Sequence, residues 1–234
     1  MTKYGVISDI HGNFPALNEV YKTLMVEHDV DEVVCCGDVV GILGWPLHTV
    51  HKIDGVCEHV VCGNHDARVR DDFGDRPEFP AADDEAKLVN ENLTDGALEL
   101  VNSWPQRVET DDFIMAHSWP QRTIDPEESL TGQVKHDLGV EPRHAPRAGK
   151  YADGKYVFLG HTHRQFEQSV DKFQGQSGHI VNPGSVGVPW HEPAEYAVVD
   201  TKTDDVLLES VEYDTDCVEE QFDYWNEKIG LKTW

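Results

Sequence analysis

The segment that decides the fold reads Tyr4-Gly5-Val6-Ile7-Ser8-Asp9-Ile10-His11-Gly12-Asn13. Its first half is a short apolar run of the kind found in buried strands. Asp9 and His11 follow the run two residues apart, so both side chains point to the same side of an extended segment. Asn13 can cap a helix, and Pro15 suits the first turn of that helix. The segment therefore predicts a strand, a polar loop and a helix in succession.

Four further segments repeat the pattern of an apolar run that ends in polar residues. Each run is short and rich in β-branched or aromatic residues, which is typical of a buried strand. They read Glu32-Val33-Val34-Cys35-Cys36-Gly37-Asp38, His59-Val60-Val61-Cys62-Gly63-Asn64-His65, Phe113-Ile114-Met115-Ala116-His117 and Tyr156-Val157-Phe158-Leu159-Gly160-His161.

Helical signals alternate with these strands. Leu17, Tyr21, Leu24 and Met25 share one face of the helix that Asn13 begins. Strands that alternate with helices predict an α/β sheet, and no linker composition divides the chain, so we expect one domain of two packed halves over residues 1–234. Further helices are expected over residues 45–52, 83–101 and 217–229, and short strands near residues 180–181, 196–199 and 206–208.

The polar residues at the strand ends form the main functional signal. In open α/β sheets, ligands bind beyond the carboxyl ends of the strands, and all five ends here carry Asp, His or Asn. Carboxylate, imidazole and amide donors together suit divalent Mn, Fe, Zn, Co or Ni. The candidate metal ligands are Asp9, His11, Asp38, Asn64, His117, His161 and His163.

A pair of metal ions explains this many donors. Two ions need a bridging ligand, and the two oxygens of Asp38 make it the natural candidate. Ions ~3.5–4 Å apart would clamp a phosphoryl group and lower the pKa of a bridging water toward ~7, which gives a hydroxide nucleophile. His65 is the candidate proton donor to the leaving alkoxide, and Asp66 or another carboxylate is expected to hold its ring.

Composition limits the possible partners. The chain has 44 acidic and 19 basic residues and a net charge of −25, which disfavours long nucleic acids and anionic membranes. We interpret the spread-out acidity as an adaptation to a salt-rich cytoplasm, where self-repulsion is screened. No run approaches the ~20 apolar residues of a membrane span, and we expect no secretory leader before the run that starts at Tyr4.

The cysteines give no metal or disulfide signal. The five of them form no CxxC pair. Cys35, Cys36 and Cys62 lie in strand-like runs, where free Cys behaves as a small buried hydrophobe. This usage is typical of a reducing compartment, so a soluble cytoplasmic protein is expected.

Together the motifs resemble the signature of the calcineurin-like metallophosphoesterase superfamily. The matching segments are Asp9-Ile10-His11-Gly12-Asn13, Gly37-Asp38, Gly63-Asn64-His65-Asp66, His117 and Gly160-His161-Thr162-His163, and Asn182-Pro183-Gly184-Ser185-Val186-Gly187 resembles its small bacterial and archaeal branch.

The resemblance implies a four-layer α/β/β/α sandwich of two packed mixed sheets, with the site between them. It implies that Asp9, His11, Asp38 and His163 hold one metal ion. It also implies that Asp38, Asn64, His117 and His161 hold the other. His65 matches the phosphate-contacting acid of the family, and we expect Asn13, Asn64 and His65 to contact substrate.

Three functions remain open from the sequence. The first is hydrolysis of a small phosphorylated substrate by a phosphatase or phosphodiesterase, and the second is hydrolysis of a dinucleoside polyphosphate. The third is a non-catalytic metal-binding interaction protein, since a retromer subunit shares this fold without the catalytic His. His65 and all seven ligands are present here, which favours an enzyme, with a homo-oligomer possible.

Substrate preference cannot be carried over from relatives. Family members often have a Tyr-Gly-Pro turn after the Gly-Asp-Val-Val-Gly stretch, whereas this chain has Ile42-Leu43-Gly44-Trp45-Pro46. Aromatic side chains near the motifs could stack on a base, although packing against the core is the interpretation we favour. They are Trp45, Trp104, Trp119 and Trp190.

Overall fold

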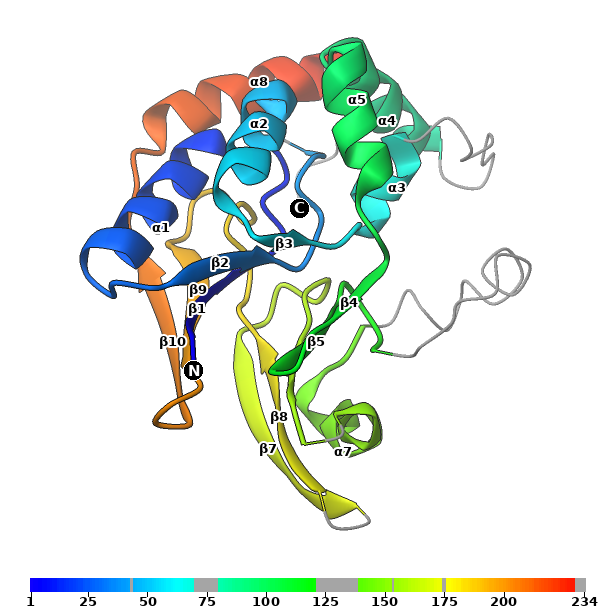
Figure 1. The fold of residues 1–234 in the computed structure, drawn as a ribbon. Coiled ribbons are helices and arrows are strands. Elements are labelled where there is room, and N and C mark those ends of the chain that lie inside the picture. Colours follow the sequence, from blue (N-terminus) through cyan, green and yellow to red (C-terminus); the bar gives the residue numbers. More distant parts are fainter. Residues whose placement is uncertain (43, 70–79, 121–138, 153, 174–175, 230–234) are drawn as a thin grey trace.

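Two five-stranded sheets pack against each other, and helices cover their outer faces (Figure 1). The computed structural model describes residues 1–42, 44–69, 80–120, 139–152, 154–173 and 176–229. Both sheets are mixed, so the expected α/β/β/α sandwich is confirmed.

The first sheet has β1 at its centre. β1 pairs parallel with β2 and antiparallel with β9, β2 pairs parallel with β3, and β9 pairs antiparallel with β10. The strands in spatial order are β10 (Asp205–Val211), β9 (Ala194–Asp200), β1 (Lys3–Ile7), β2 (Glu32–Cys35) and β3 (His59–Val60).

The second sheet has β6 at its centre, paired parallel with β5 and with β8. Its edge strands β4 and β7 run antiparallel to their neighbours. The strands in spatial order are β4 (Arg107–Glu109), β5 (Phe113–Ala116), β6 (Tyr156–Phe158), β8 (Gln176–Asn182) and β7 (Phe166–Phe173).

Helices α1, α2, α3, α4, α5 and α8 lie on the side of the first sheet, and α7 lies on the side of the second (Figure 1). Short 3-10 turns, Pro142–His144 and Gly149–Tyr151, flank α7. The helices are α1 (Phe14–Val26), α2 (Pro46–Val56), α3 (Asn64–Val69), α4 (Pro80–Glu91), α5 (Asp95–Ser103), α7 (Ala145–Ala148) and α8 (Asp216–Ile229). No described helix is both long and apolar enough to cross a membrane.

Alternation along the strands divides the apolar residues between the layers. In β5, Phe113 and Met115 pack between the two sheets, while Ile114 packs under α7. In β1, Tyr4 and Val6 face the second sheet in the same way. Burial on both faces explains why these strands read as continuous apolar runs in the sequence.

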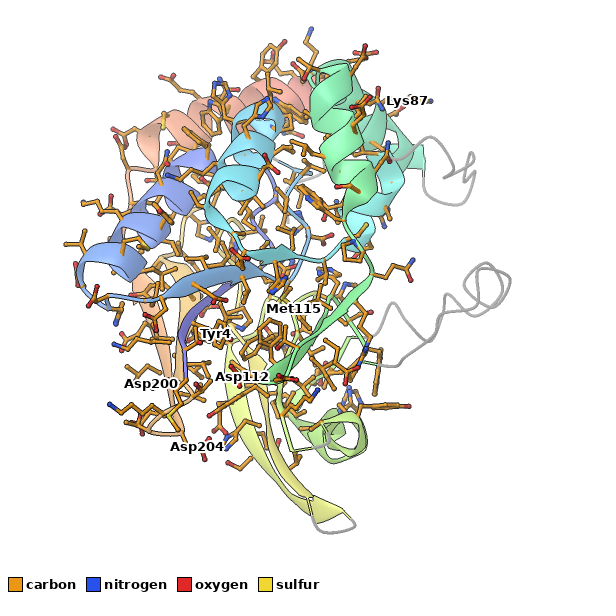
Figure 2. All side chains as sticks on the ribbon, viewed as in Figure 1. Tyr4, Lys87, Asp112, Met115, Asp200 and Asp204 are labelled. Carbon is orange, nitrogen blue, oxygen red and sulfur yellow. The ribbon has the colours of Figure 1, made fainter. Side chains whose placement is uncertain are left out.

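Polar contacts join the two sheets at the end of β1 that is remote from Asp9. The Tyr4 hydroxyl donates a hydrogen bond to Oδ2 of Asp112 at 3.0 Å, and the Tyr156 hydroxyl contacts Asp204 in the turn between β9 and β10 (Figure 2). These contacts fix one end of the sandwich, and the polar loops at the other end form the site.

The structure corrects one expected helix. Residues 83–101 were expected to form a single helix, but α4 ends at Glu91 and α5 begins at Asp95. The amide of Asn92 bonds the Val89 carbonyl, which closes the first helix with a tight turn. Oγ1 of Thr94 then accepts the amide of Ala97 and caps the second.

Two strands were missed because they are edge strands with little apolar sequence. β7 reads Phe-Glu-Gln-Ser-Val-Asp-Lys-Phe, and β4 has three residues. The buried state expected for Cys35, Cys36 and Cys62 is confirmed. Burial raises the pKa of Cys35 and of Cys36 well above its ordinary value, so both remain thiols.

Candidate metal centre

The seven predicted ligands meet where the carboxyl ends of strands from both sheets face each other. Loops after β1 and β2 and the start of α3 supply those from the first sheet, and loops after β5 and β6 supply those from the second. Asp9, His11, Asp38 and His117 are buried, while Asn64, His161 and His163 are half-buried.

The backbone at this edge is strained in a pattern that follows the predicted ligands. Seven described non-glycine residues have positive φ, and five of them are Asp9, His11, Asp38, His161 and His163, with φ between 49° and 70°. Such a conformation costs free energy in an L-residue and persists where the surrounding structure enforces it. Concentration of this strain at one site points to a functional role for these loops.

Close backbone approach makes one glycine necessary. A Cβ atom on Gly63 would collide with the carboxylate and the amide of Asp38. The absence of a side chain there lets the loop after β3 reach Asp38, whose Oδ1 accepts the amide of His65 at 2.7 Å. The Gly-Asn-His order in the sequence therefore has a steric cause.

The Asn-Pro-Gly-Ser segment after β8 holds two ligand loops together. Nδ2 of Asn182 donates to the Gly160 carbonyl at 2.8 Å, just before His161. Oγ of Ser185 donates to the Asp9 carbonyl at 2.9 Å. The motif thus braces the loops after β1 and β6 without contributing a ligand of its own.

One group of donor atoms surrounds Asp9. Its Oδ1 lies 3.3 Å from Nε2 of His163 and 3.9 Å from Nε2 of His11. The two imidazole Nε2 atoms of His11 and His163 are 3.1 Å apart. These three side chains can offer one atom each within 4.8 Å of one another, which is the spacing of a metal site.

A second group surrounds Asp38. Its Oδ2 lies 3.2 Å from Nε2 of His117 and 3.8 Å from Nε2 of His11. Asp9, Asp38 and His117 form another set of three with donor atoms within 4.8 Å. One carboxylate oxygen of Asp38 is therefore shared between two groups of imidazoles.

His117 and Asn64 present their donor atoms inward. Nδ1 of His117 donates to the Cys36 carbonyl at 2.7 Å, which turns Nε2 toward the carboxylates. Oδ1 of Asn64 lies 3.1 Å from that Nε2 and 2.8 Å from Nδ1 of His161. These hydrogen bonds bring a carboxamide oxygen and two imidazoles to one point.

The charges of the cluster suit cations. Burial raises the pKa of Asp38, but His117 and His65 outweigh it and hold that pKa well below its ordinary value. Burial lowers the pKa of His11 well below its usual range, so its imidazole is neutral. Nδ1 of His11 is buried without a hydrogen-bond partner. Anionic carboxylates and a neutral imidazole are the ligand forms of divalent metals, so these residues fit such ions.

The structure decides which of the two expected partners, Asp66 or another carboxylate, meets the ring of His65. Oδ1 of Asp66 accepts the amides of Val39 and Val40, and its Oδ2 accepts the amide of Gly63. Burial raises the pKa of Asp66 to about 6. The carboxylate that meets the ring is Glu85 of α4, whose Oε1 lies 2.7 Å from Nδ1 of His65. Asp66 thus fixes the loops around Asp38 and does not hold the His65 ring.

Asn13 is also corrected, from a substrate-binding to a structural residue. Its Oδ1 accepts the amide of Ala16 at 3.2 Å and caps α1. Its Nδ2 donates to the Gly187 carbonyl and to the Tyr213 hydroxyl. The side chain is fully buried with both ends in use, so it has no atom free for a substrate.

Sequence reasoning missed Glu85, although one signal was available. Val89 of α4 is buried, and a residue four positions earlier lies on the same helical face. A Glu on the apolar face of an amphipathic helix is unusual unless it has a buried partner.

The four tryptophans near the motifs pack against hydrophobic clusters of the described residues, as we expected, and not as a platform for stacking on a base. Trp104 belongs to the core under the helices, and Trp119 packs on the core beneath α7. Trp45 and Trp190 pack on the cluster that includes Phe222 of α8, with 5.6 Å between the Trp190 and Phe222 ring centroids.

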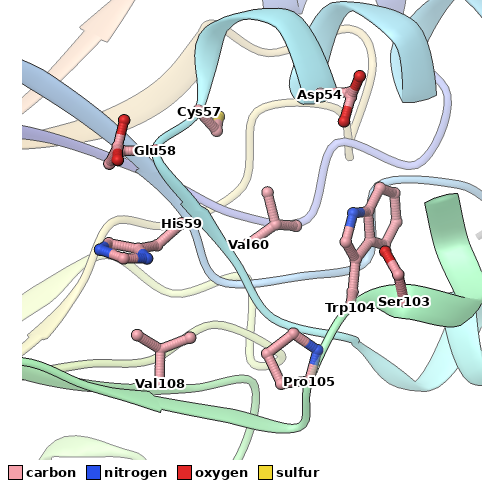
Figure 3. A pocket seen from close by; sticks show the side chains of 9 residues that line it. All are labelled: Asp54, Cys57, Glu58, His59, Val60, Ser103, Trp104, Pro105 and Val108. Atoms are coloured by element: carbon pink, nitrogen blue, oxygen red, sulfur yellow. The ribbon is translucent and has the colours of Figure 1, made fainter.

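A pocket of about 280 Å³ lies elsewhere, between the end of α2, β3, the end of α5 and β4 (Figure 3). Its lining includes Glu58, His59 and Trp104, and no predicted metal ligand contributes to it. This pocket is therefore distinct from the metal cluster.

A two-sheet sandwich with buried Asp and His donors at facing strand ends is the arrangement typical of the phosphoesterase class of hydrolases. The chain belongs to the calcineurin-like phosphoesterase superfamily, whose domain model matches residues 2–204.

Individual relatives agree with this family. An uncharacterized protein of Methanocaldococcus jannaschii is 28% identical over 232 residues, which cover 89% of this chain and 87% of that one. A metallophosphoesterase from Sphaerobacter thermophilus has a TM-score of 0.75 at 22% identity, covering 98% and 97% of the two chains. A hypothetical protein from Pyrococcus horikoshii has a TM-score of 0.68 at 19% identity, with the same coverage. Both structures support the fold.

Proposed function

We propose that this protein hydrolyses a small phosphoester and that two divalent cations are bound in its centre. The observation that carries the proposal is the position of Asp38 Oδ2, at 3.8 Å from His11 Nε2 and 3.2 Å from His117 Nε2. A carboxylate oxygen between two imidazoles is suited to bridge two ions. Asp9, His11, Asp38 and His163 would hold one ion, and Asp38, Asn64, His117 and His161 the other.

Bound ions of this kind polarise a phosphoryl oxygen and lower the pKa of a bound water toward ~7. The chain's own residues supply the rest. Glu85 accepts from Nδ1 of His65 and so orients the ring. Burial lowers the pKa of His65, but Asp38 and Glu85 outweigh it, so that pKa lies above its ordinary value. A protonated His65 beside the cluster would donate its proton to the leaving oxygen.

Two other functions compete with this one. Hydrolysis of a dinucleoside polyphosphate would use the same groups on a phosphoric anhydride. A non-catalytic metal-binding interaction protein would bind cations and phosphate without turnover. The pairing of His65 with Glu85 favours an enzyme, because a scaffold has no need for an oriented proton donor. A cytoplasmic location and a halophilic habitat are also parts of the proposal, and the acidity supports the habitat. The donor set supports divalent Mn, Fe, Zn, Ni or Co as the bound ions.

The test begins with removal of the metal. Protein treated with a chelator should lose turnover, and titration with Mn, Ni, Co, Zn or Mg in high salt should restore it on a phosphomonoester and phosphodiester panel. Metal analysis should give two equivalents per chain. Turnover that survives complete metal removal would refute the proposal, and tight phosphate binding without turnover would establish the interaction protein.

A further inference from the structure

Arg68 lies beside the ring of His65, one helical turn later in α3. Its Nη1 is 3.4 Å from Nε2 of His65, and its side chain is half-buried. It therefore brings a fixed positive charge to the edge of the metal cluster, because a guanidinium stays protonated in proteins.

The guanidinium of Arg68 lacks an acidic partner within the described part of the chain. Its contact with His65 uses at most one of five N–H donors and is long for a hydrogen bond. Other half-buried cations do pair, as Arg107 and Lys155 do with Glu109. An Arg without an acidic partner among the described residues is unexpected in a chain with 44 acidic and 19 basic residues. No described residue occupies its remaining donors, so they can bind an anion from outside the protein.

The geometry around His65 decides where that anion would lie. Glu85 accepts a hydrogen bond from Nδ1 of His65, so Nε2 is the ring nitrogen that faces the substrate. Gly41 makes this orientation possible, since a Cβ there would come within 3.1 Å of His65 Nδ1 and 3.3 Å of Glu85 Oε1. An oxygen atom bound by Nε2 of His65 would also lie within reach of Arg68.

We propose that Arg68 binds the leaving group and that the preferred leaving group is itself a phosphate. This inference rests on the hydrolytic site of the proposed function, in which His65 faces the leaving oxygen, and of the two hydrolytic reactions named there it selects the one on a phosphoric anhydride. The substrate class is then a phosphoric anhydride, such as a nucleoside diphosphate or a longer polyphosphate ester. A planar guanidinium matches phosphate oxygens in a bidentate fashion, whereas an alcohol leaving group offers no such anion.

The reaction balances without a further reactant. The water oxygen bonds to the terminal phosphorus, the bridging P–O bond breaks, and the leaving phosphate keeps the bonding electron pair. One water proton stays on the attacking oxygen and the other is released. A phosphate leaves as an anion near neutral pH because its second pKa is about 6, so positive charge helps it more than a proton does.

The experiment compares Arg68→Gln and Arg68→Lys with the wild type, with Lys22→Gln on α1 as a charge-matched control. Binding of imidodiphosphate, whose P–N–P bridge resists hydrolysis, and of orthophosphate is measured by calorimetry at one fixed free Mn²⁺ concentration. Turnover is measured in parallel on pyrophosphate and on p-nitrophenyl phosphate, and metal content and melting temperature are recorded for each variant.

Arg68→Gln should weaken imidodiphosphate binding and pyrophosphate kcat/KM by about 10- to 100-fold, the usual worth of a hydrogen bond to a charged group. Orthophosphate binding and p-nitrophenyl phosphate turnover should change far less. Arg68→Lys should recover part of the loss, and Lys22→Gln should match the wild type. Equal losses on both ligands, or no loss on either, would overturn the proposal. If the wild type hydrolyses nothing, the proposed function fails, and the binding comparison still decides the role of Arg68.

Discussion

Asp38 is the residue on which both groups of donor atoms depend. Asp38→Asn removes one negative charge and puts a neutral amide group in place of the carboxylate between His11 and His117. We expect loss of bound metal and of turnover, measured by metal analysis and a phosphoester assay. Asp54→Asn, an exposed change on α2, is the control and should keep both. Full metal content with full activity in Asp38→Asn would exclude Asp38 as a bridge.

Glu85 acts through His65 and gives a second prediction for a single residue. Glu85→Gln keeps the shape of the side chain but removes the charge opposite Nδ1 of His65. Metal content should stay the same, while the rate on alkyl phosphates should fall by about 10- to 100-fold. His65→Ala should cost more, about 10²–10⁴-fold.

Leaving-group dependence separates the role of Glu85 from a structural one. p-Nitrophenyl esters need little protonation, so both variants should lose less on them than on alkyl phosphates. A uniform loss across leaving groups would show that the pair binds phosphate and does not deliver a proton. Glu85→Asp, which keeps the charge, should recover part of the rate.

The capping of α1 provides the prediction at the scale of an element. Asn13→Ala removes the cap and leaves the Gly187 carbonyl without its buried donor. We expect a loss of about 1–3 kcal/mol in the free energy of unfolding, with KM unchanged. Thr94→Ala at the start of α5, which removes one capping bond, should cost about 1 kcal/mol. A raised KM in stable Asn13→Ala protein would restore its assignment as a substrate ligand.

The main feature at the scale of the whole molecule is its net charge of −25. With 44 acidic and 19 basic residues, repulsion at ~0.01 M salt extends over ~30 Å, whereas at ~1 M it contracts to ~3 Å. We expect the melting temperature and the activity to rise together as KCl goes from tens of millimolar toward molar. An ordinary phosphoesterase should instead lose activity, because salt weakens capture of an anionic substrate. A melting temperature that is flat or falls over this range would contradict the halophilic interpretation.

The sequence by itself determined the fold class and the seven residues that gather at the centre. The reason is local: each ligand lies within a few residues of the end of a strand, and parallel strands bring their carboxyl ends to one edge of a sheet. Alternation within β1, β5 and β6 then fixes which side chains lie between the sheets. These features depend on residues close together in the chain, so the order of residues reveals them.

Only the tertiary structure decided which side chains and carbonyls form hydrogen bonds with the predicted site residues His65 and Asn13. Asp66 is adjacent to His65 in the chain, yet Glu85, 20 residues away, meets its ring. The packing of α4 on α3 causes this, since Nδ2 of Asn90 also binds the Val69 carbonyl and fixes the pair of helices. Nδ2 of Asn13 likewise donates its hydrogen bonds to Gly187 and Tyr213, which are 174 and 200 residues away in the chain. Partners of this kind depend on how distant elements pack, and no local pattern in the sequence encodes that packing.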